Sequence, residues 1–263
     1  DTLHDVKFSG ISWYGNDGFF YSSYDKPKGS ELSEKTQIHK LYYHKLGRPQ
    51  QQDELIFGGD ATPRRYVGGG VTEDGTTLVI SAANATYGNE LYIMDLNSKQ
   101  RPLIAIATGF DFEYDIVHKN GDDLYMLTNM QAPNRKLVKL NVKQAGNGAW
   151  TTVIEEGKFP LSVSTCGNKL FAQYLENAVS KVYQYDLSGK REKEIVLPGL
   201  GTAGGFSGKV EETELYYTFT SYVYPPTIFR YDIKTGKTEL YKKAGVKFDP
   251  SLYESRQVFY TSG

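Results

Sequence analysis

Short runs of alternating apolar and polar residues fill this chain, and one such run occurs five times. Aligned on its second residue, the run recurs at spacings of 50, 46, 45 and 46 residues. Strict alternation is the period of a half-buried β-strand, and a repeat of this length indicates a repeat architecture. The copies read KLYYHKL (40–46), ELYIMDL (90–96), KLVKLNV (136–142), KVYQYDL (181–187) and TIFRYDI (227–233).

Each repeat resolves into four predicted strands, of which the recurring run is the third. Turns rich in Gly, Asp and Asn introduce most of the second strands, and these residues tolerate the positive φ angles of tight hairpins. The second strands are GFFYSSY (18–24), TTLVISA (76–82), DLYMLTN (123–129), NKLFAQYL (168–175) and ELYYTFTS (214–221). The first strands are VKFSGISW, RYVGGGVT, FEYDIVH, PLSVSTC and GGFSGKV, and the fourth strands are ELIFGG, PLIAIAT, TTVIEE, KEIVLPG and ELYKKAG.

Four antiparallel strands in each repeat are typical of a β-propeller blade. We therefore predict an all-β chain, a β-propeller of five four-stranded antiparallel blades of about 45–50 residues each. Glycines inside the first strands, such as Gly68–Gly70, predict close backbone approach there. Residues 246–263 break the repeat and read as a strand-like exit segment. The blades are predicted at 1–60, 61–109, 110–157, 158–200 and 201–245.

Composition narrows the partners and leaves the compartment open. The formal net charge of −1 gives no reason to expect nucleic acid or an acidic membrane surface as a partner. No apolar run approaches the length that spans a bilayer. Cys166 is the single cysteine, so neither an internal disulfide nor a cysteine metal cluster is expected. A lone thiol fits the cytoplasm and does not exclude the periplasm.

Candidate chemistry is sparse along the chain. The four histidines have no metal-ligand spacing, and His39 and His44 are predicted to face opposite sides of one strand. Residues 199–204 match the glycine pattern of dinucleotide sites, but a strand follows where that site needs a helix. We expect no metal and no cofactor. Distant residues could still form a Ser/His/Asp triad, although nothing in the sequence supports one.

Several stretches resemble the prolyl oligopeptidase (prolyl endopeptidase) family. Residues 214–232, ELYYTFTSYVYPPTIFRYD, look like the last propeller blade of that family, and TNMQAPNRKL at 128–137 is similar to its TN-x-x-x-PN-x-x-L turn. Matches also occur at Val6–Ser9, Lys40–His44 and Gln257–Tyr260. The resemblance implies five blades of a seven-bladed propeller that caps an α/β-hydrolase domain of the same polypeptide.

The resemblance also implies a function. The parent would be a serine peptidase, a hydrolase that cleaves short peptides after proline, and its Ser/Asp/His triad would lie in the hydrolase domain. The propeller would restrict access, and this chain alone is expected to be an inactive fragment. Phe8, Val67 and Ala85 fall at family positions that help bind the third peptide residue upstream of cleavage. The family often has larger or sulfur-bearing residues at the latter two, and Phe8 could instead be an ordinary core aromatic.

Two other functions remain open at this stage. A self-contained five-bladed propeller could bind carbohydrate or protein, which would require specific polar groups along its axis and a strand that closes the ring. A five-bladed glycosidase would need inward carboxylates at matched positions, and the first strands offer only Glu113 and Asp115. If blades are missing, apolar sheet faces stay exposed. We then expect an open arc of blades or self-association rather than a contracted ring.

Overall fold

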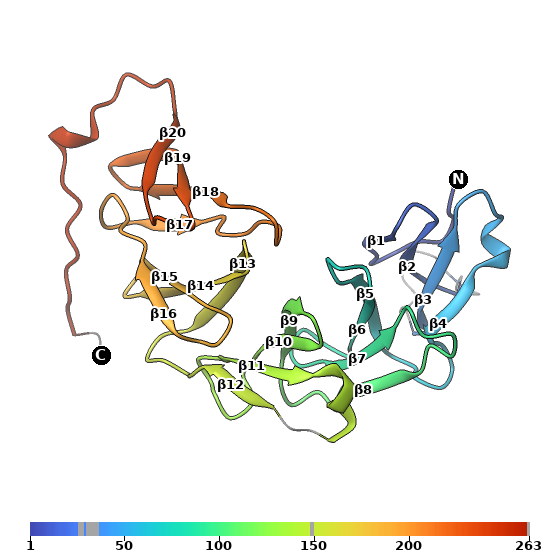
Figure 1. Cartoon of the computed structure of the whole chain (residues 1–263). Coiled ribbons are helices and arrows are strands. Elements are labelled where there is room, and N and C mark those ends of the chain that lie inside the picture. The colour runs from blue at the N-terminus through green and yellow to red at the C-terminus, as the bar shows by residue number, and fades with distance from the viewer. Residues whose placement is uncertain (26–28, 30–36, 148–149, 262–263) are drawn as a thin grey trace. The chain divides into compact units, whose positions relative to one another are not determined.

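A computed structural model describes residues 1–25, 29, 37–147 and 150–261. Within these residues the chain forms five four-stranded sheets, each built from strands consecutive in sequence (Figure 1). The predicted all-β fold class is confirmed. The chain divides into two compact units, one of Asp1–Met130 with Lys139–Thr151, the other of Gln131–Val138 with the residues from Thr152 onward. We describe each unit by itself.

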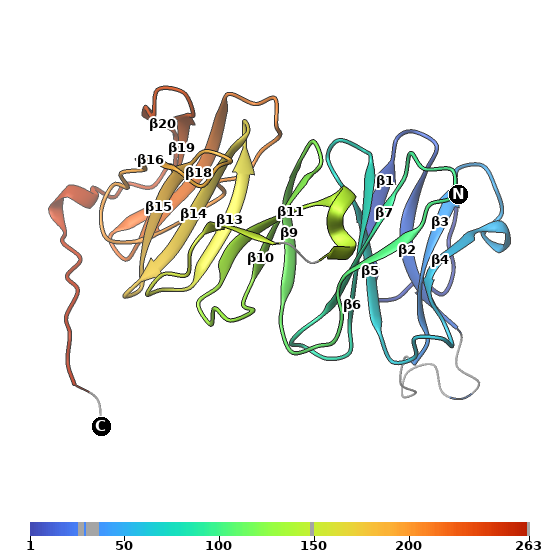
Figure 2. The ribbon, with the colours of Figure 1, turned by 60° about the horizontal axis from the view of Figure 1, so that its bottom comes forward.

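The first unit contains the first two blades. Their sheets lie side by side, with β5 packed against strands of the first blade (Figure 2). The first sheet has the order β1 (Ile11–Tyr14), β2 (Gly18–Tyr24), β3 (His39–Lys45) and β4 (Glu54–Gly58), with the 3-10 turn Gln50–Gln52 before β4. The second has the order β5 (Tyr66–Val71), β6 (Thr77–Ala83), β7 (Glu90–Asp95) and β8 (Leu103–Ala107).

The third, fourth and fifth sheets repeat this arrangement. The third consists of β9 (Tyr114–Asn120), β10 (Asp123–Thr128), β11 (Lys136–Asn141) and β12 (Thr151–Ile154), with a 3-10 segment at Val142–Asn147. The fourth consists of β13 (Leu161–Cys166), β14 (Lys169–Glu176), β15 (Val179–Tyr185) and β16 (Arg191–Glu194). The fifth consists of β17 (Thr202–Gly204), β18 (Glu214–Ser221), β19 (Tyr224–Asp232) and β20 (Thr238–Lys243).

Two predicted first strands differ from the structure, and local backbone geometry explains both. The run VKFSGISW is strand only from Ile11, because Phe8 has a φ of 54° that no extended strand accommodates. In GGFSGKV the strand ends at Gly204, since Gly205 has a φ of 99°. The backbone that follows bonds to the fourth blade instead, where the Gly208 amide donates to the Thr165 carbonyl at 2.9 Å.

Apolar side chains from neighbouring blades form the core. In the first unit one cluster joins the first two blades and includes Phe20, Leu41 and Ile80. Gly69 fits there because a Cβ at this position would lie 2.7 Å from a methyl carbon of the Leu41 side chain. The close backbone approach predicted for Gly68–Gly70 is not found: Gly68 and Gly70 face open space. The second unit has a cluster between the fourth and fifth blades, with Phe206 and Tyr217 at its centre. Burying one such side chain stabilises the fold by about 1.5–3 kcal/mol.

Side chains of one blade also bind the free edge of the next. The first strand of each sheet is an edge strand, so its outward amides and carbonyls lack a partner strand. Asn89 supplies both partners to the third blade: its Oδ1 accepts from the Tyr114 amide at 2.9 Å and its Nδ2 donates to the Tyr114 carbonyl at 3.1 Å. In the second unit, Ser180 Oγ accepts from the Ala203 amide at 3.0 Å.

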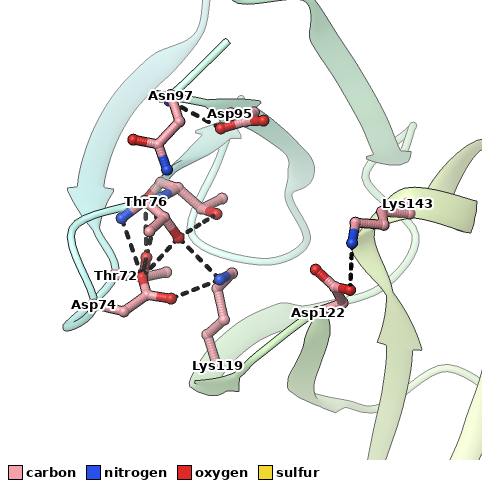
Figure 3. Close-up of polar contacts among 9 residues, drawn as sticks. Thr72, Asp74, Thr76, Asp95, Asn97, Lys119, Asp122 and Lys143 are labelled. Carbon is pink, nitrogen blue, oxygen red and sulfur yellow. Dashed lines mark hydrogen bonds and ion pairs between the residues drawn. The ribbon is translucent and has the colours of Figure 1, made fainter.

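The β5–β6 turn forms a second polar link between the second and third blades (Figure 3). Lys119 Nζ, on β9, lies 2.6 Å from Asp74 Oδ2 and donates to Thr76 Oγ1 at 2.9 Å. Burial alone would raise the pKa of Asp74, but hydrogen bonds from Lys119, Thr72 and Thr76 outweigh it and hold that pKa well below its usual range. Asp74 is therefore ionised, and its ion pair with Lys119 joins the second blade to the third.

Beyond β20 the chain carries one 3-10 turn, Pro250–Leu252, and no strand as far as residue 261. Residues 257–260, predicted as strand-like, lie in this part, where no strand pairs with their backbone. Their apolar side chains Val258, Phe259 and Tyr260 are exposed. Throughout the described residues, the structure contains no helix long and apolar enough to cross a membrane.

Candidate functional site

The candidate site lies at one end of the first two blades, where an exposed aromatic residue occupies an unusual backbone conformation. Phe8 has a φ of 54°, in the left-handed region that bulky residues rarely adopt. Its ring is 61% exposed. Such strain persists only where surrounding contacts impose it, and it is concentrated at functional sites. The conformation holds a large apolar ring in solvent, so Phe8 is not an ordinary core aromatic.

Phe8 is one half of an aromatic corner with Tyr66, the first residue of β5. The two ring centroids lie 5.6 Å apart and the ring planes meet at 88°. Tyr66 is itself 46% exposed. The Lys7 ammonium lies 5.1 Å from the centre of the Phe8 ring and 5.6 Å from that of Tyr24, within cation–π range. The corner therefore offers two apolar surfaces beside one positive charge.

Val67, the second candidate from the sequence, points away from this corner. Its side chain is 2% exposed and packs in the core between the first two blades. Successive side chains of a strand point to opposite faces, so burial of Val67 turns Tyr66 outward. Sequence reasoning did not single out Tyr66. The alternation along RYVGGGVT was the signal that could have identified it.

Ala85, the third candidate, lies in the exposed loop between β6 and β7. Tyr66 pairs with Ala83, the last residue of β6, so this loop leaves the sheet beside the aromatic corner. The structure thus brings the Ala85 loop and Phe8 to the same end of the first two blades. A role in peptide binding stays a prediction for Phe8, Val67 and Ala85 alike.

His39 connects the two backbone segments that carry the corner. Its Nδ1 accepts from the Val67 amide at 2.8 Å, and its Nε2 lies 3.0 Å from the Lys7 carbonyl oxygen. An amide can only donate, so Nδ1 is unprotonated and Nε2 carries the proton that Lys7 accepts. Burial lowers the pKa of His39, and the bond to Lys7 offsets this only in part. His39 is therefore neutral at pH 7.

His44 lies on the opposite face of β3, as predicted from its spacing to His39. Its Nδ1 lies 2.8 Å from Asp53 Oδ1 and its Nε2 lies 3.2 Å from Asp1 Oδ2. Asp53 also accepts from the Tyr21 hydroxyl at 2.8 Å. These contacts fasten the N-terminal segment to the first blade. Among the described residues, no group of three or more His, Cys, Asp or Glu side chains could hold a metal ion.

A cavity of about 390 Å³ in the second unit was a further candidate. It lies between the fourth and fifth blades, and its polar side chains bind one another: Lys169 pairs with Glu192 at 2.6 Å, and Gln184 donates to Glu192 at 2.8 Å. Lys193 donates to the Lys234 carbonyl at 2.6 Å. Lys169, Gln184, Glu192 and Lys193 are thus engaged with protein groups rather than with a ligand. We therefore take the aromatic corner as the stronger candidate.

A family model and curated relatives match this chain over nearly all or all of its length. The family described as the prolyl oligopeptidase N-terminal beta-propeller domain matches residues 1–244. The chain is 54% identical over its whole length to a prolyl endopeptidase of Elizabethkingia meningoseptica and 55% identical to one of Elizabethkingia miricola. It spans 37% of the length of each of these relatives.

Solved structures agree. A chain from a study of two prolyl endopeptidases, concerned with inter-domain dynamics in catalysis and specificity, superimposes with a TM-score of 0.83 at 32% identity. The match covers 95% of the present chain and 36% of that chain. Prolyl oligopeptidase B of Galerina marginata shares the fold with a TM-score of 0.85 at 24% identity, over 97% of the present chain and 37% of its own.

Proposed function

This chain belongs to the family of prolyl oligopeptidase N-terminal β-propeller domains, and from that premise we propose that it is the substrate-gating part of a prolyl endopeptidase. In this proposal an α/β-hydrolase domain of the same polypeptide cleaves short peptides after proline. The propeller admits short peptides and excludes folded proteins and long polypeptides. It contacts the bound peptide through Phe8 and the Ala85 loop. The chain by itself is inactive.

The observation that carries the proposal is the exposed, strained Phe8 within a chain related along its length to prolyl endopeptidases. An exposed aromatic ring on a left-handed backbone lowers the stability of the fold. Such strained residues are concentrated at functional sites, where the strained conformation serves ligand binding. The relatives bear the name of a proline-specific peptidase and are longer than this chain. A catalytic partner domain in the same polypeptide accounts for both facts.

Exposed apolar residues support a larger propeller. On β1, Ser12 and Tyr14 bond to the second blade, whereas Ile11 and Trp13 point the other way and are exposed. On the fifth blade, Tyr241 is exposed as well. Apolar sheet faces of this kind pack against a neighbouring blade in a propeller. We propose that blades outside this sequence cover them within a seven-bladed parent.

A chimera tests the proposal. The matching segment of the Elizabethkingia meningoseptica enzyme, 54% identical, is replaced by this chain. The chimera should cleave a chromogenic proline peptide, and the 263-residue chain alone should leave it uncut. The chimera should also spare a long unstructured polypeptide rich in proline. Rapid degradation of that polypeptide would contradict gating, and peptidase activity of the chain alone would contradict its role as a non-catalytic part.

A further inference from the structure

Lys7 carries a positive charge that no carboxylate in contact with it balances. Its ammonium group lies 5.1 Å from the centre of the Phe8 ring and 5.6 Å from that of the Tyr24 ring, so two aromatic groups hold it by cation–π contacts. Within the described part of the chain, this ammonium group forms no ion pair. The half-buried side chain is therefore kept in place by rings and not by an anion.

Other cations of the first two blades are paired with carboxylates. The Lys40 ammonium lies 2.6 Å from Asp25 Oδ1, and Arg65 Nε lies 3.0 Å from Glu90 Oε2. An aromatic ring attracts a cation through its quadrupole, but it carries no net charge that could neutralise the cation. Lys7 therefore still attracts an anion, whereas Lys40 and Arg65 already have one.

The backbone that carries Lys7 is fixed to the first blade. Ser23 Oγ donates to the Asp5 carbonyl at 2.8 Å, and His39 Nε2 donates to the Lys7 carbonyl at 3.0 Å. A lysine side chain normally loses rotamer freedom when it binds a partner, and this loss opposes binding. Because the rings and the backbone bonds already restrict Lys7, it loses less freedom when an anion binds.

The position of Lys7 beside Phe8 indicates which part of a peptide would meet it. In the proposed function Phe8 contacts one side chain of the bound peptide. In an extended peptide, side chains two residues apart point to the same side and are separated by about 6.6 Å. The downstream residues lead to the cleaved bond in the hydrolase domain. The second residue upstream of the one at Phe8 therefore brings its side chain beside the Lys7 ammonium.

We propose that Lys7 is a specificity-determining residue, the cationic subsite for an acidic side chain in the upstream part of the peptide. This inference rests on the proposed function, which makes short proline peptides the ligands. The subsite favours Glu or Asp over their neutral amides, and it disfavours Lys and Arg because like charges repel.

Binding of three peptides to the full chain tests the assignment. The probes are acetyl-Glu-Gly-Phe-Ala-Pro-amide and its counterparts with Gln or Lys in place of Glu, titrated at pH 7 while NMR follows the ring signals of Phe8 and Tyr24. The wild-type chain should bind the Glu peptide about twofold to fivefold more tightly than the Gln peptide, and the Lys peptide most weakly. These differences should shrink from about 0.01 M to about 1 M salt, because the screening length falls from about 30 Å to about 3 Å.

Reversing the charge gives a readout that a purely structural role would not change. Lys7→Glu should reverse the order of the Glu and Lys peptides, Lys7→Met should abolish the order, and Lys7→Arg should keep it. Lys45 is the matched control, because it is exposed at the opposite end of β3 from His39. Lys45→Glu changes the net charge by the same amount and should leave the order as in wild type.

The proposal is wrong if the wild-type chain binds the three peptides equally or binds none of them. It is also wrong if Lys7→Glu weakens all three by the same factor, because Lys7 would then only support the Phe8 ring. Reversal by Lys45→Glu would overturn it too, since the overall charge of the chain would then set the order. The chimera and its chromogenic peptide decide separately whether the proposed function holds.

Discussion

Replacing Asn89 should reveal how much one side chain contributes to the link between the second and third blades. Its amide group satisfies both the amide and the carbonyl of Tyr114, which lie on the free edge of β9. Asn89 and Tyr114 are both buried. In Asn89→Ala both backbone groups lose their partners. An unsatisfied buried group costs about 1–3 kcal/mol, so loss of both partners should lower the unfolding free energy by about 2–6 kcal/mol.

Asn89→Asp refines the test. The carboxylate can still accept from the Tyr114 amide, but its other oxygen faces the Tyr114 and Glu90 carbonyls, to which Asn89 donates. This repulsion raises the folded-state pKa of the new Asp above its unfolded value of about 3.9. Stability should therefore recover toward acid pH and be lost as pH rises through the folded pKa. At pH 7 the variant should be no more stable than Asn89→Ala.

Urea unfolding of the whole chain measures the loss, and amide exchange at Tyr114 locates it. Exposed Asn97, on the β7–β8 turn, is the matched control, and Asn97→Ala should change stability by less than about 0.5 kcal/mol. If Asn89→Ala also stayed within about 0.5 kcal/mol and left Tyr114 exchange unchanged, the edge-satisfaction argument would be refuted.

Three other substitutions test local geometry and titration. Gly88 and Gly75 have φ angles of 73° and 71°, but a Cβ would collide with a backbone carbonyl only at residue 88. Gly88→Ala should therefore lose at least about 2 kcal/mol more unfolding free energy than Gly75→Ala, as measured by urea unfolding. Equal losses in the two variants would contradict this prediction. Lys119→Met should lower stability at pH 7 and make stability depend less on acid pH. The stability that comes from the depressed pKa of Asp74 is present above the unfolded pKa of about 3.9 and is lost as pH falls through the folded pKa. Urea midpoints equal to those of the wild-type chain at every pH from 7 to 3 would contradict this prediction. Burial lowers the pKa of His118, so the folded chain with neutral His118 is stable above about pH 6.5 and loses stability as pH falls below that value. The melting temperature of His118→Phe should therefore change less between pH 8 and 5 than that of the wild-type chain. A larger loss at acid pH in the variant would contradict this prediction.

The sequence carried the fold almost completely because the pattern that defines a strand is local. The run at 18–24 coincides with β2, and ELYYTFTS coincides with β18. At Phe8 and Gly205 a single positive φ angle displaces a predicted first strand. The predicted fourth strand KEIVLPG is shorter in the structure, where β16 ends at Glu194, and residues 257–260 form no strand. A Phe in the left-handed region cannot be read from composition, because contacts with other segments impose it.

The site was predictable only in part for a related reason. Phe8 could be selected because its neighbours match a known motif, but its partner Tyr66 is 58 residues away and is recognised by contact. The core role of Val67 follows from strand alternation once the register is known. The sequence shows that His39 lacks metal-ligand spacing and faces the opposite side of its strand from His44, but not which groups it binds. Its double hydrogen bond joins segments that lie together only in the folded blade pair.

The bonds at the blade edges also bear on how such a chain can be rearranged in evolution. Between the first and second blades, two side chains bind the edge strand: His39 accepts from the Val67 amide and Ser22 donates to the Val67 carbonyl. Between the second and third blades, Asn89 alone binds both the amide and the carbonyl of Tyr114. Between the fourth and fifth blades, Ser180 accepts from the Ala203 amide. Each of these three junctions therefore uses its own set of donors and acceptors. Although the repeats look interchangeable in sequence, shuffling or duplicating one would pair the wrong donors and acceptors, which selects against recombination between them.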